Sequence, residues 1–159
     1  MKYKTPYIIM GILILLLMYF SVFCKPNINF STEINNISTQ DYKNILDSNQ
    51  IILEENKDID NFKYLSVNVK IKAPYILVKN VKISTPGLEQ YLDNNNITIL
   101  GTGGVDAYME KTEQVLVYLN NVDEKSLKNI LKDFKYVLQW SNIWNKIDKV
   151  NCYFNDYLK

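Results

Sequence analysis

The sequence predicts an N-terminal transmembrane helix followed by a mainly-β domain that folds as a sandwich of two sheets. Three observations support this fold class. Residues 7–24 carry no charge, residues 65–72 alternate strictly between apolar and polar side chains, and further short β-branched runs follow toward the C-terminus. The same pattern leaves open an α+β fold with one antiparallel sheet as the alternative.

The N-terminal segment is the predicted membrane anchor. As a helix, residues 7–24 would be about 27 Å long, close to the roughly 30 Å hydrocarbon core of a bilayer. Lys2 and Lys4 precede this segment and only Lys25 follows it closely, so the positive-inside rule places the N-terminus in the cytoplasm and the remaining chain outside. Phe23 and its neighbours make a weak cleavage site, which favours a retained signal anchor in the cell membrane.

The chain is therefore expected to have four parts. Residues 1–6 form the cytoplasmic N-terminus, residues 7–24 form the transmembrane anchor, and residues 25–38, which are polar and rich in asparagine, form a stalk. Residues 39–159 form the extracytoplasmic sandwich, whose length is typical of one folded domain.

The composition excludes several classes of function. The 18 lysines and 17 carboxylates nearly cancel, so no overall field favours nucleic acid. There is no histidine, which removes the usual general base near neutral pH and the commonest transition-metal ligand. We therefore expect a protein that is not an enzyme and binds no cofactor. The abundance of asparagine, isoleucine, lysine and tyrosine is typical of an AT-rich genome, as in a low-GC bacterium.

The two cysteines lie far apart in the sequence. Cys24 would sit at the membrane edge and Cys152 in a strand close to the C-terminus. Two unpaired thiols are the simpler expectation, and a disulfide between them is the alternative.

The domain is expected to begin with a helix and a short strand. Thr39 is the expected N-cap of a helix over residues 39–49, because apolar residues follow it at helical spacing. Residues 50–55 are a brief strand candidate.

A hairpin of two strands is expected next. In residues 64–72 the apolar side chains fall on one face and the polar ones on the other, which predicts a strand half-buried against a core. The following run, residues 75–84, changes parity partway, and a β-bulge near Lys79 and Asn80 would restore the pairing.

Two further helices are expected between the later strands. The first covers residues 85–96, with Thr85 as its N-cap and proline at the first helical position. The second, over residues 123–134, begins at Asp123 and carries an apolar stripe.

The closing strands resemble those of an immunoglobulin-like domain in architecture. Residues 113–121 form a strand that leads through the last helix to a hairpin of residues 135–140 and 149–154. The cysteine–tryptophan–cysteine framework of true immunoglobulin domains is absent. The resemblance implies an immunoglobulin-like β-sandwich with short connecting helices.

The stretch "ITILGTGGVDAY", residues 97–108, is the only one that suggests a nucleotide-binding loop. A dinucleotide-binding fingerprint needs a third glycine where Asp106 stands, and a P-loop needs a lysine after the glycines. We therefore expect no nucleotide, and we interpret the glycines as a loop between two strands. The acidic run at residues 54–60 could hold calcium but lacks a calcium-loop pattern, so a solvated loop is the simpler interpretation.

Lysines and aromatic residues supply the candidate interaction surface. Lys70 and Lys72 lie on the polar face of an alternating strand. Trp144 follows the closing strand in a stretch rich in turn formers and is expected to be exposed, whereas Trp140 is expected to be buried. Tyr153 and Tyr157 complete the candidate surface.

The predicted function is binding or assembly without catalysis. The chain is expected to act as a membrane-anchored interaction module of the cell envelope, with the bilayer contacted through residues 7–24 and a protein partner bound by the sandwich. The alternative is an extracytoplasmic sensor that binds a ligand or an ion through residues 101–108 or 54–60.

Overall fold

The computed structural model of the chain describes residues 4–23, 25–48, 58–73, 78–84, 86–95, 97–119 and 122–158. The helices are α1 (Lys4–Phe23), α2 (Thr39–Ser48), α3 (Leu88–Asp93) and α4 (Glu124–Leu131), with 3₁₀ turns η1 (Ile59–Asn61) and η2 (Phe154–Tyr157). The strands are β1 (Asn27–Asn36), β2 (Phe62–Lys72), β3 (Val78–Ser84), β4 (Thr98–Ala107), β5 (Glu110–Tyr118), β6 (Lys135–Asn142) and β7 (Ile147–Tyr153).

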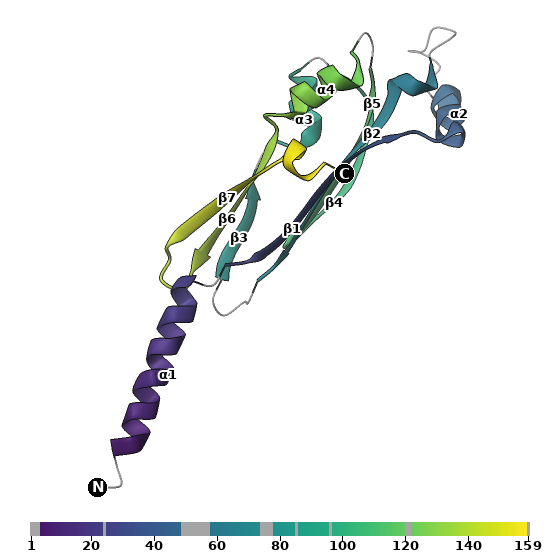
Figure 1. Cartoon of the computed structure of the whole chain (residues 1–159). Coiled ribbons are helices and arrows are strands. Elements are labelled where there is room, and N and C mark those ends of the chain that lie inside the picture. Colours follow the sequence, from purple (N-terminus) through teal and green to yellow (C-terminus); the bar gives the residue numbers. More distant parts are fainter. Residues whose placement is uncertain are drawn as a thin grey trace.

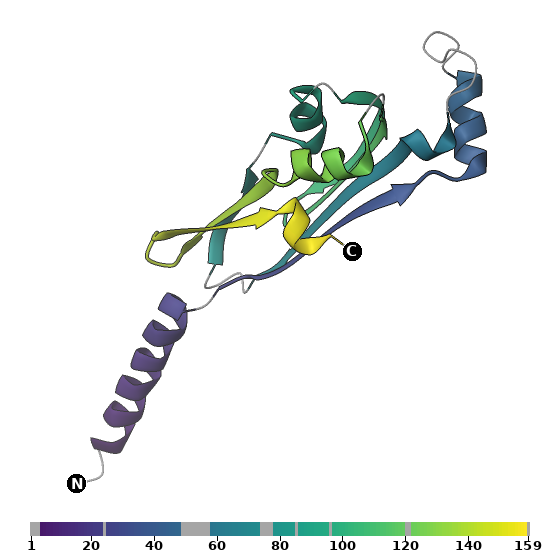
Figure 2. The same cartoon turned by 45° about the horizontal axis from the view of Figure 1, so that its top comes forward.

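The described strands form a mainly-β domain of two antiparallel sheets. Sheet A has the order β1-β2-β5-β4, and sheet B has the order β3-β6-β7. The same strand order, A-B-E-D beside C-F-G, defines constant-type immunoglobulin domains. The two sheets stack face to face, and α3 and α4 lie at the end away from α1 (Figures 1 and 2). The alternative prediction, an α+β fold with one sheet, is wrong.

The core lies between the sheets, because the strands alternate between buried and exposed side chains. Leu65, Val67 and Val69 of β2 are at most 1% exposed, as the alternation of residues 64–72 predicts. Tyr136 and Leu138 of β6 meet them from sheet B and are fully buried. Each such aliphatic side chain contributes about 1.5–3 kcal/mol to folding through burial.

Strand β1 replaces the stalk that was predicted for residues 25–38. Phe30 and Thr32 are buried against the core and Ile28 is half-buried, whereas Asn27 and Asn29 lie on the outer face. The asparagines therefore mark the solvated face of a strand and not a linker. The Thr32 hydroxyl also donates a 2.7 Å hydrogen bond to the carbonyl oxygen of Phe154, which joins β1 to η2.

Helix α2 packs on the outer face of sheet A, at the end away from α1 (Figure 2). Tyr42 and Ile45 of this helix contact a second apolar cluster, in which the Tyr42 and Phe62 rings are 5.3 Å apart. The Ser38 side chain accepts a hydrogen bond from the Asp41 amide, so the cap lies one residue before the predicted Thr39. The strand candidate at 50–55 lies outside the described residues.

The predicted bulge in the second hairpin strand is confirmed. The pairing of β3 with β6 shifts register between Lys79 and Lys82, and Asn80 has a φ of 51°. Helix α4 also begins as predicted, since the Asp123 carboxylate accepts a 2.7 Å hydrogen bond from the Ser126 amide. Helix α3 begins later than predicted, with Gly87 as its N-cap.

The glycine-rich stretch is a strand and not the predicted loop. Residues 98–107 form β4, which pairs with β5 along its whole length after a register shift between Ile99 and Gly101. A side chain at Gly104, whose φ is +156°, would overlap the carbonyl oxygen of Thr112, so the strand itself requires glycine there. The prediction of a loop is wrong because glycines interrupt the apolar alternation without interrupting the backbone pairing.

The N-terminal helix overturns the prediction of a membrane anchor. No helix in the described part of the chain is both long enough and apolar enough to cross a membrane. The predicted transmembrane anchor at residues 7–24, and with it the single-pass location in the cell membrane with the C-terminal domain outside, is therefore wrong.

Candidate functional site

Helix α1 exposes apolar side chains on all sides. From Tyr7 to Phe20, its large apolar side chains are between 47% and 71% exposed, and the described stretch carries no charged or amide side chain. A helix at the surface of a soluble domain normally has a polar side that faces water. Because α1 has none, apolar material from outside the described chain is needed to cover it.

The strand registers bring several turns to the end of the domain where α1 is attached. Strand β1 starts there, its first residue Asn27 pairs with Lys72 at the end of β2, and Lys70 pairs with Glu110 at the start of β5. The turn between β4 and β5 therefore lies at this end. Figure 1 shows the turn between β6 and β7 at the same end, beside the top of α1. We call this region the α1-proximal end.

Exposed apolar side chains gather at the α1-proximal end. In the described domain outside α1, five large hydrophobic side chains are exposed, and four of them lie in or beside these two turns. They are Val105 (59% exposed), Tyr108 (65%), Trp144 (57%) and Ile147 (62%). Such a concentration at one end is typical of a binding surface, whereas single exposed apolar residues scattered over a domain are not.

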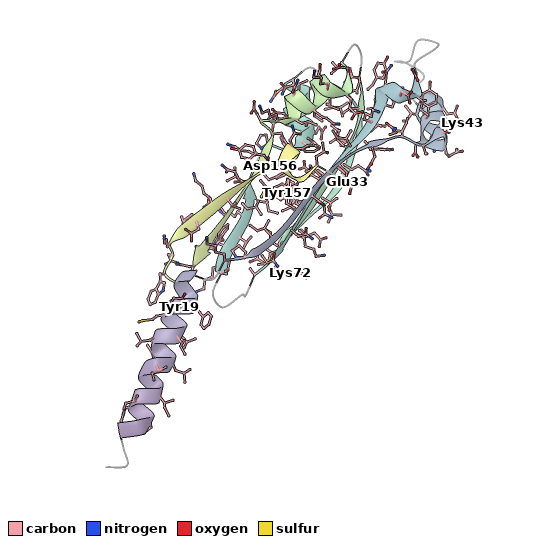
Figure 3. The ribbon with its side chains drawn as sticks, in the orientation of Figure 1. Tyr19, Glu33, Lys43, Lys72, Asp156 and Tyr157 are labelled. Atoms are coloured by element: carbon pink, nitrogen blue, oxygen red, sulfur yellow. The ribbon has the colours of Figure 1, made fainter. Side chains whose placement is uncertain are left out.

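We call these four exposed side chains the apolar rim. A polar hollow lies beside it. It has a volume of about 300 Å³ and is lined by Asn27, Ile28, Asn29, Lys70 and Lys72. Lys70 forms an exposed ion pair with Glu110, whose Oε2 is 3.3 Å from its Nζ. Figure 3 shows Lys72 at this end of the domain. The hollow therefore adds a positively charged edge to the apolar surface.

The structure brings together only part of the predicted interaction surface. Lys70, Lys72 and Trp144 lie at the α1-proximal end, but Tyr153 and Tyr157 lie elsewhere. The Tyr157 ring packs edge-on against Phe30 at 4.9 Å, on the buried side of β1, whereas Lys70 and Lys72 lie on the exposed face of β2. The Tyr153 ring, on the outer face of sheet B, has the ammonium group of a lysine 5.4 Å above it.

The exposure of Trp144 follows from the turn that carries it. Asn142 Oδ1 accepts hydrogen bonds from the amides of Trp144 (2.9 Å) and Lys146 (3.0 Å), and Asn145 has a φ of 59°. This tight turn ends the alternation and directs Trp144 away from the core, as predicted from the turn formers around it. Trp140, two residues before Asn142, is 5% exposed, as predicted.

Inside the domain, three titratable residues form a polar network that the sequence analysis did not predict. Glu113 of β5 accepts hydrogen bonds from the Tyr136 hydroxyl and from the Leu88 amide (2.6 Å), and its Oε1 lies 2.8 Å from Lys111 Nζ. Burial alone would raise the pKa of Glu113, but these hydrogen bonds and the Lys111 charge together lower it. Burial, and then the Glu113 carboxylate, raise the pKa of Tyr136.

This network is suited to structure and not to chemistry. The Glu113 carboxylate already accepts three donors, so it is held as a charged acceptor and is not available as a general base. It joins β5, β6 and the start of α3, and the Lys111 ammonium also lies 5.7 Å above the Tyr136 ring. The network therefore fixes the two sheets and α3 relative to one another.

The described residues support neither a metal site nor calcium binding by the acidic run at residues 54–60. No group of three or more potential metal ligands occurs among them. In the acidic run, Asp58 caps η1 by accepting a hydrogen bond from the Asp60 amide at 3.0 Å, and the rest of the run lies outside the described residues. Cys152 is a buried free thiol in β7, and its possible partner Cys24 also lies outside them.

No protein-family model, no curated protein and no solved structure matches this chain.

Proposed function

We propose that this chain is a non-catalytic interaction and assembly subunit that binds a protein partner through α1 and the α1-proximal end. The observation that carries the proposal is the exposure of α1, which has no polar side and whose apolar side chains are at least 47% exposed. In a protein complex such a helix is surrounded by the apolar faces of neighbouring helices.

The apolar rim of the α1-proximal end also supports the binding of a protein partner that covers α1. Tyr108, Trp144 and Ile147 project from two turns that lie around the attachment of α1. Aromatic side chains of this kind supply much of the binding energy in protein interfaces. A partner that encloses α1 would meet this rim next, and the lysines of the adjacent hollow would contact acidic groups at its border.

Sedimentation of the complex isolated from the natural source tests this proposal. The wild-type chain should sediment with a second protein in fixed stoichiometry. Leu13→Gln combined with Leu16→Gln, which places two amides on one side of α1, should release the chain from that complex. Lys43→Gln on α2, at the opposite end of the domain, is the matched control and should leave it intact. Retention of the complex by the α1 variant would refute the proposal.

Binding of a small molecule is the second candidate function, and one observation favours it. A hollow of about 480 Å³ with mainly apolar walls lies between α3 and sheet B, within the size range of ligand pockets. It is lined by Ser84, Pro86, Tyr91, Asp133, Phe134, Lys135 and Val137. Val137→Trp should fill this hollow, so a fluorescent apolar probe that binds the wild type there should not bind the variant. Equal binding to both proteins would exclude the hollow as the site.

A further inference from the structure

Among the described strands, β4 has an edge that is exposed and unpaired over residues 102–107, although α3 contacts part of the strand. Sheet A ends at β1 and β4, and the edge of β1 is covered by η2 and by the bridge between Thr32 and Leu158. Residues 102–107 of β4 are all exposed, and no described residue pairs with their outer side. A long exposed edge with free backbone groups is a template for another strand.

The edges of sheet B carry the features that usually prevent such pairing. Strand β3 has a bulge and exposes Lys79 and Lys82. Strand β7 carries Asp148 and the exposed Lys149. Asp106 is the only charged residue between the first and last residues of β4, and it lies near the end of the strand.

Two glycines of β4 are not required by the fold of this chain. A Cβ built on Gly101 or Gly103 meets no atom within 4 Å, and neither has a positive φ. This distinguishes them from Gly104, where a side chain would overlap the backbone of β5. A glycine inside a strand weakens the strand, and it often marks a place where another backbone or a ligand approaches closely.

An acidic pocket lies beside these glycines. It has a volume of about 180 Å³, and its walls come from β4, β5 and the start of α3. The lining residues are Gly87, Glu89, Thr102, Gly103, Glu113, Gln114 and Val115. Gly103 is paired with Gln114 of β5, and both residues line the pocket.

The charges around the pocket define the side chain that fits it. Glu89 and Glu113 line it, and Asp106, whose side chain is 79% exposed, lies farther along β4. Lys111 is 2.8 Å from Glu113 and 3.8 Å from Asp106, and its side chain is only 16% exposed. Lys111 is thus paired with Glu113, so the Glu89 carboxylate supplies the remaining negative charge of the pocket, which favours a basic side chain.

We infer that the free edge of β4 binds an extended segment of another protein by strand addition, and that a lysine or arginine of this segment enters the pocket lined by Glu89 and Glu113. Backbone hydrogen bonds provide the affinity, and alternate side chains provide the specificity. A second copy of this chain does not fit this description, because β4 has no basic residue between Thr98 and Ala107. This surface is separate from α1 and shares only Val105 with the exposed apolar residues of the α1-proximal end, so the inference does not depend on the proposed function.

Hydrogen exchange of the full chain, measured by mass spectrometry with synthetic peptides, tests this inference. The probe is a nine-residue peptide of alternating threonine and valine with a central lysine. It should slow exchange in residues 98–107 and leave residues 27–36 unchanged. The same peptide with N-methyl groups on alternate backbone nitrogens should produce no effect, because it cannot pair. A central glutamate should weaken binding about tenfold through repulsion by the pocket.

A pair of variants tests the pocket. Glu89→Gln should weaken the lysine peptide about threefold to fivefold, the size expected for one partly exposed ion pair. Asp93→Asn, on the same helix but outside the lining of the pocket, should leave binding unchanged. Three results would overturn the inference: no slowing in residues 98–107 at millimolar peptide, equal binding of the N-methylated peptide, or equal binding by Glu89→Gln. Slowing of the same residues on concentrating the chain without peptide would instead identify a second copy as the occupant and also overturn it.

Discussion

Glu113 of β5 and Tyr136 of β6 connect the two sheets, because the tyrosine hydroxyl donates a hydrogen bond across the core to the carboxylate. The Tyr136 side chain is fully buried, and Glu113 Oε2 also accepts the Leu88 amide. One carboxylate oxygen therefore holds sheet A, sheet B and the start of α3 together.

Removing the Tyr136 hydroxyl should destabilise the domain while keeping its ring in the core. Tyr136→Phe should lower the free energy of unfolding by about 1.5–3 kcal/mol, the range for a hydrogen bond to a charged group. Tyr153→Phe, on the outer face of sheet B, is the control and should cost much less. Urea unfolding of both variants measures the difference, and equal effects would show that the connection contributes nothing.

The Glu113 carboxylate should make stability depend on pH at the acid end. Its pKa is lowered in the folded protein, so its contribution is fully present above the unfolded value of about 4.5 and is lost as pH falls through the lower folded pKa. Glu113→Gln should therefore be less stable than the wild type at neutral pH, and the difference should shrink as the solution is acidified below pH 4.5. A difference that stayed constant, or grew, toward acid pH would contradict this assignment.

The two tryptophans should respond differently to replacement. Trp140 is 5% exposed and Trp144 is 57% exposed. Trp140→Ala should therefore cost about 3–5 kcal/mol, whereas Trp144→Ala should cost little. In single-tryptophan proteins, iodide should quench Trp144 readily and leave Trp140 protected. Equal quenching would mean that the register of the β6–β7 hairpin is wrong.

Neighbouring glycines of β4 provide a test of the strand itself. Gly104→Ala should destabilise the pairing with β5 by several kcal/mol, because its Cβ would overlap the carbonyl oxygen of Thr112. Gly103→Ala meets no atom within 4 Å and should change stability by less than about 1 kcal/mol. Thermal unfolding compares the two variants. A similar loss for both would indicate that residues 98–107 are not held in the register described.

Local sequence patterns correctly predicted the structural elements that are determined by residues close together in the chain. The alternation of β2, the bulge at Lys79 and Asn80, and the Asp123 cap of α4 each depend on residues close together in the chain. Strand β1 and the glycine-containing part of β4 after residue 100 were missed for a physical reason. Asparagines occupy the solvated face of one, glycines interrupt the other, and in both cases the strand is held by its neighbours.

In the candidate site, too, the features set by adjacent residues were predicted, and those set by pairing between distant strands were not. The turn formers around Trp144 predicted its exposure, because the turn is made by adjacent residues. That Trp144 and Tyr108 lie at the same end of the domain depends on the registers of two sheets, which no local pattern contains. The membrane anchor was predicted from the length and apolar composition of residues 7–24 and from the lysines that flank them, and the structure overturns it.

Photocrosslinking within the natural complex tests the binding of a protein partner by α1 and the α1-proximal end most directly. A photoreactive amino acid would replace Leu15 in α1, Ile147 at the rim or Lys43 on α2, which Figure 3 shows at the opposite end. Leu15 and Ile147 should give an adduct with the same single protein, and Lys43 should give none. The absence of a discrete protein adduct at Leu15, as with crosslinks to phospholipid alone, would contradict the account.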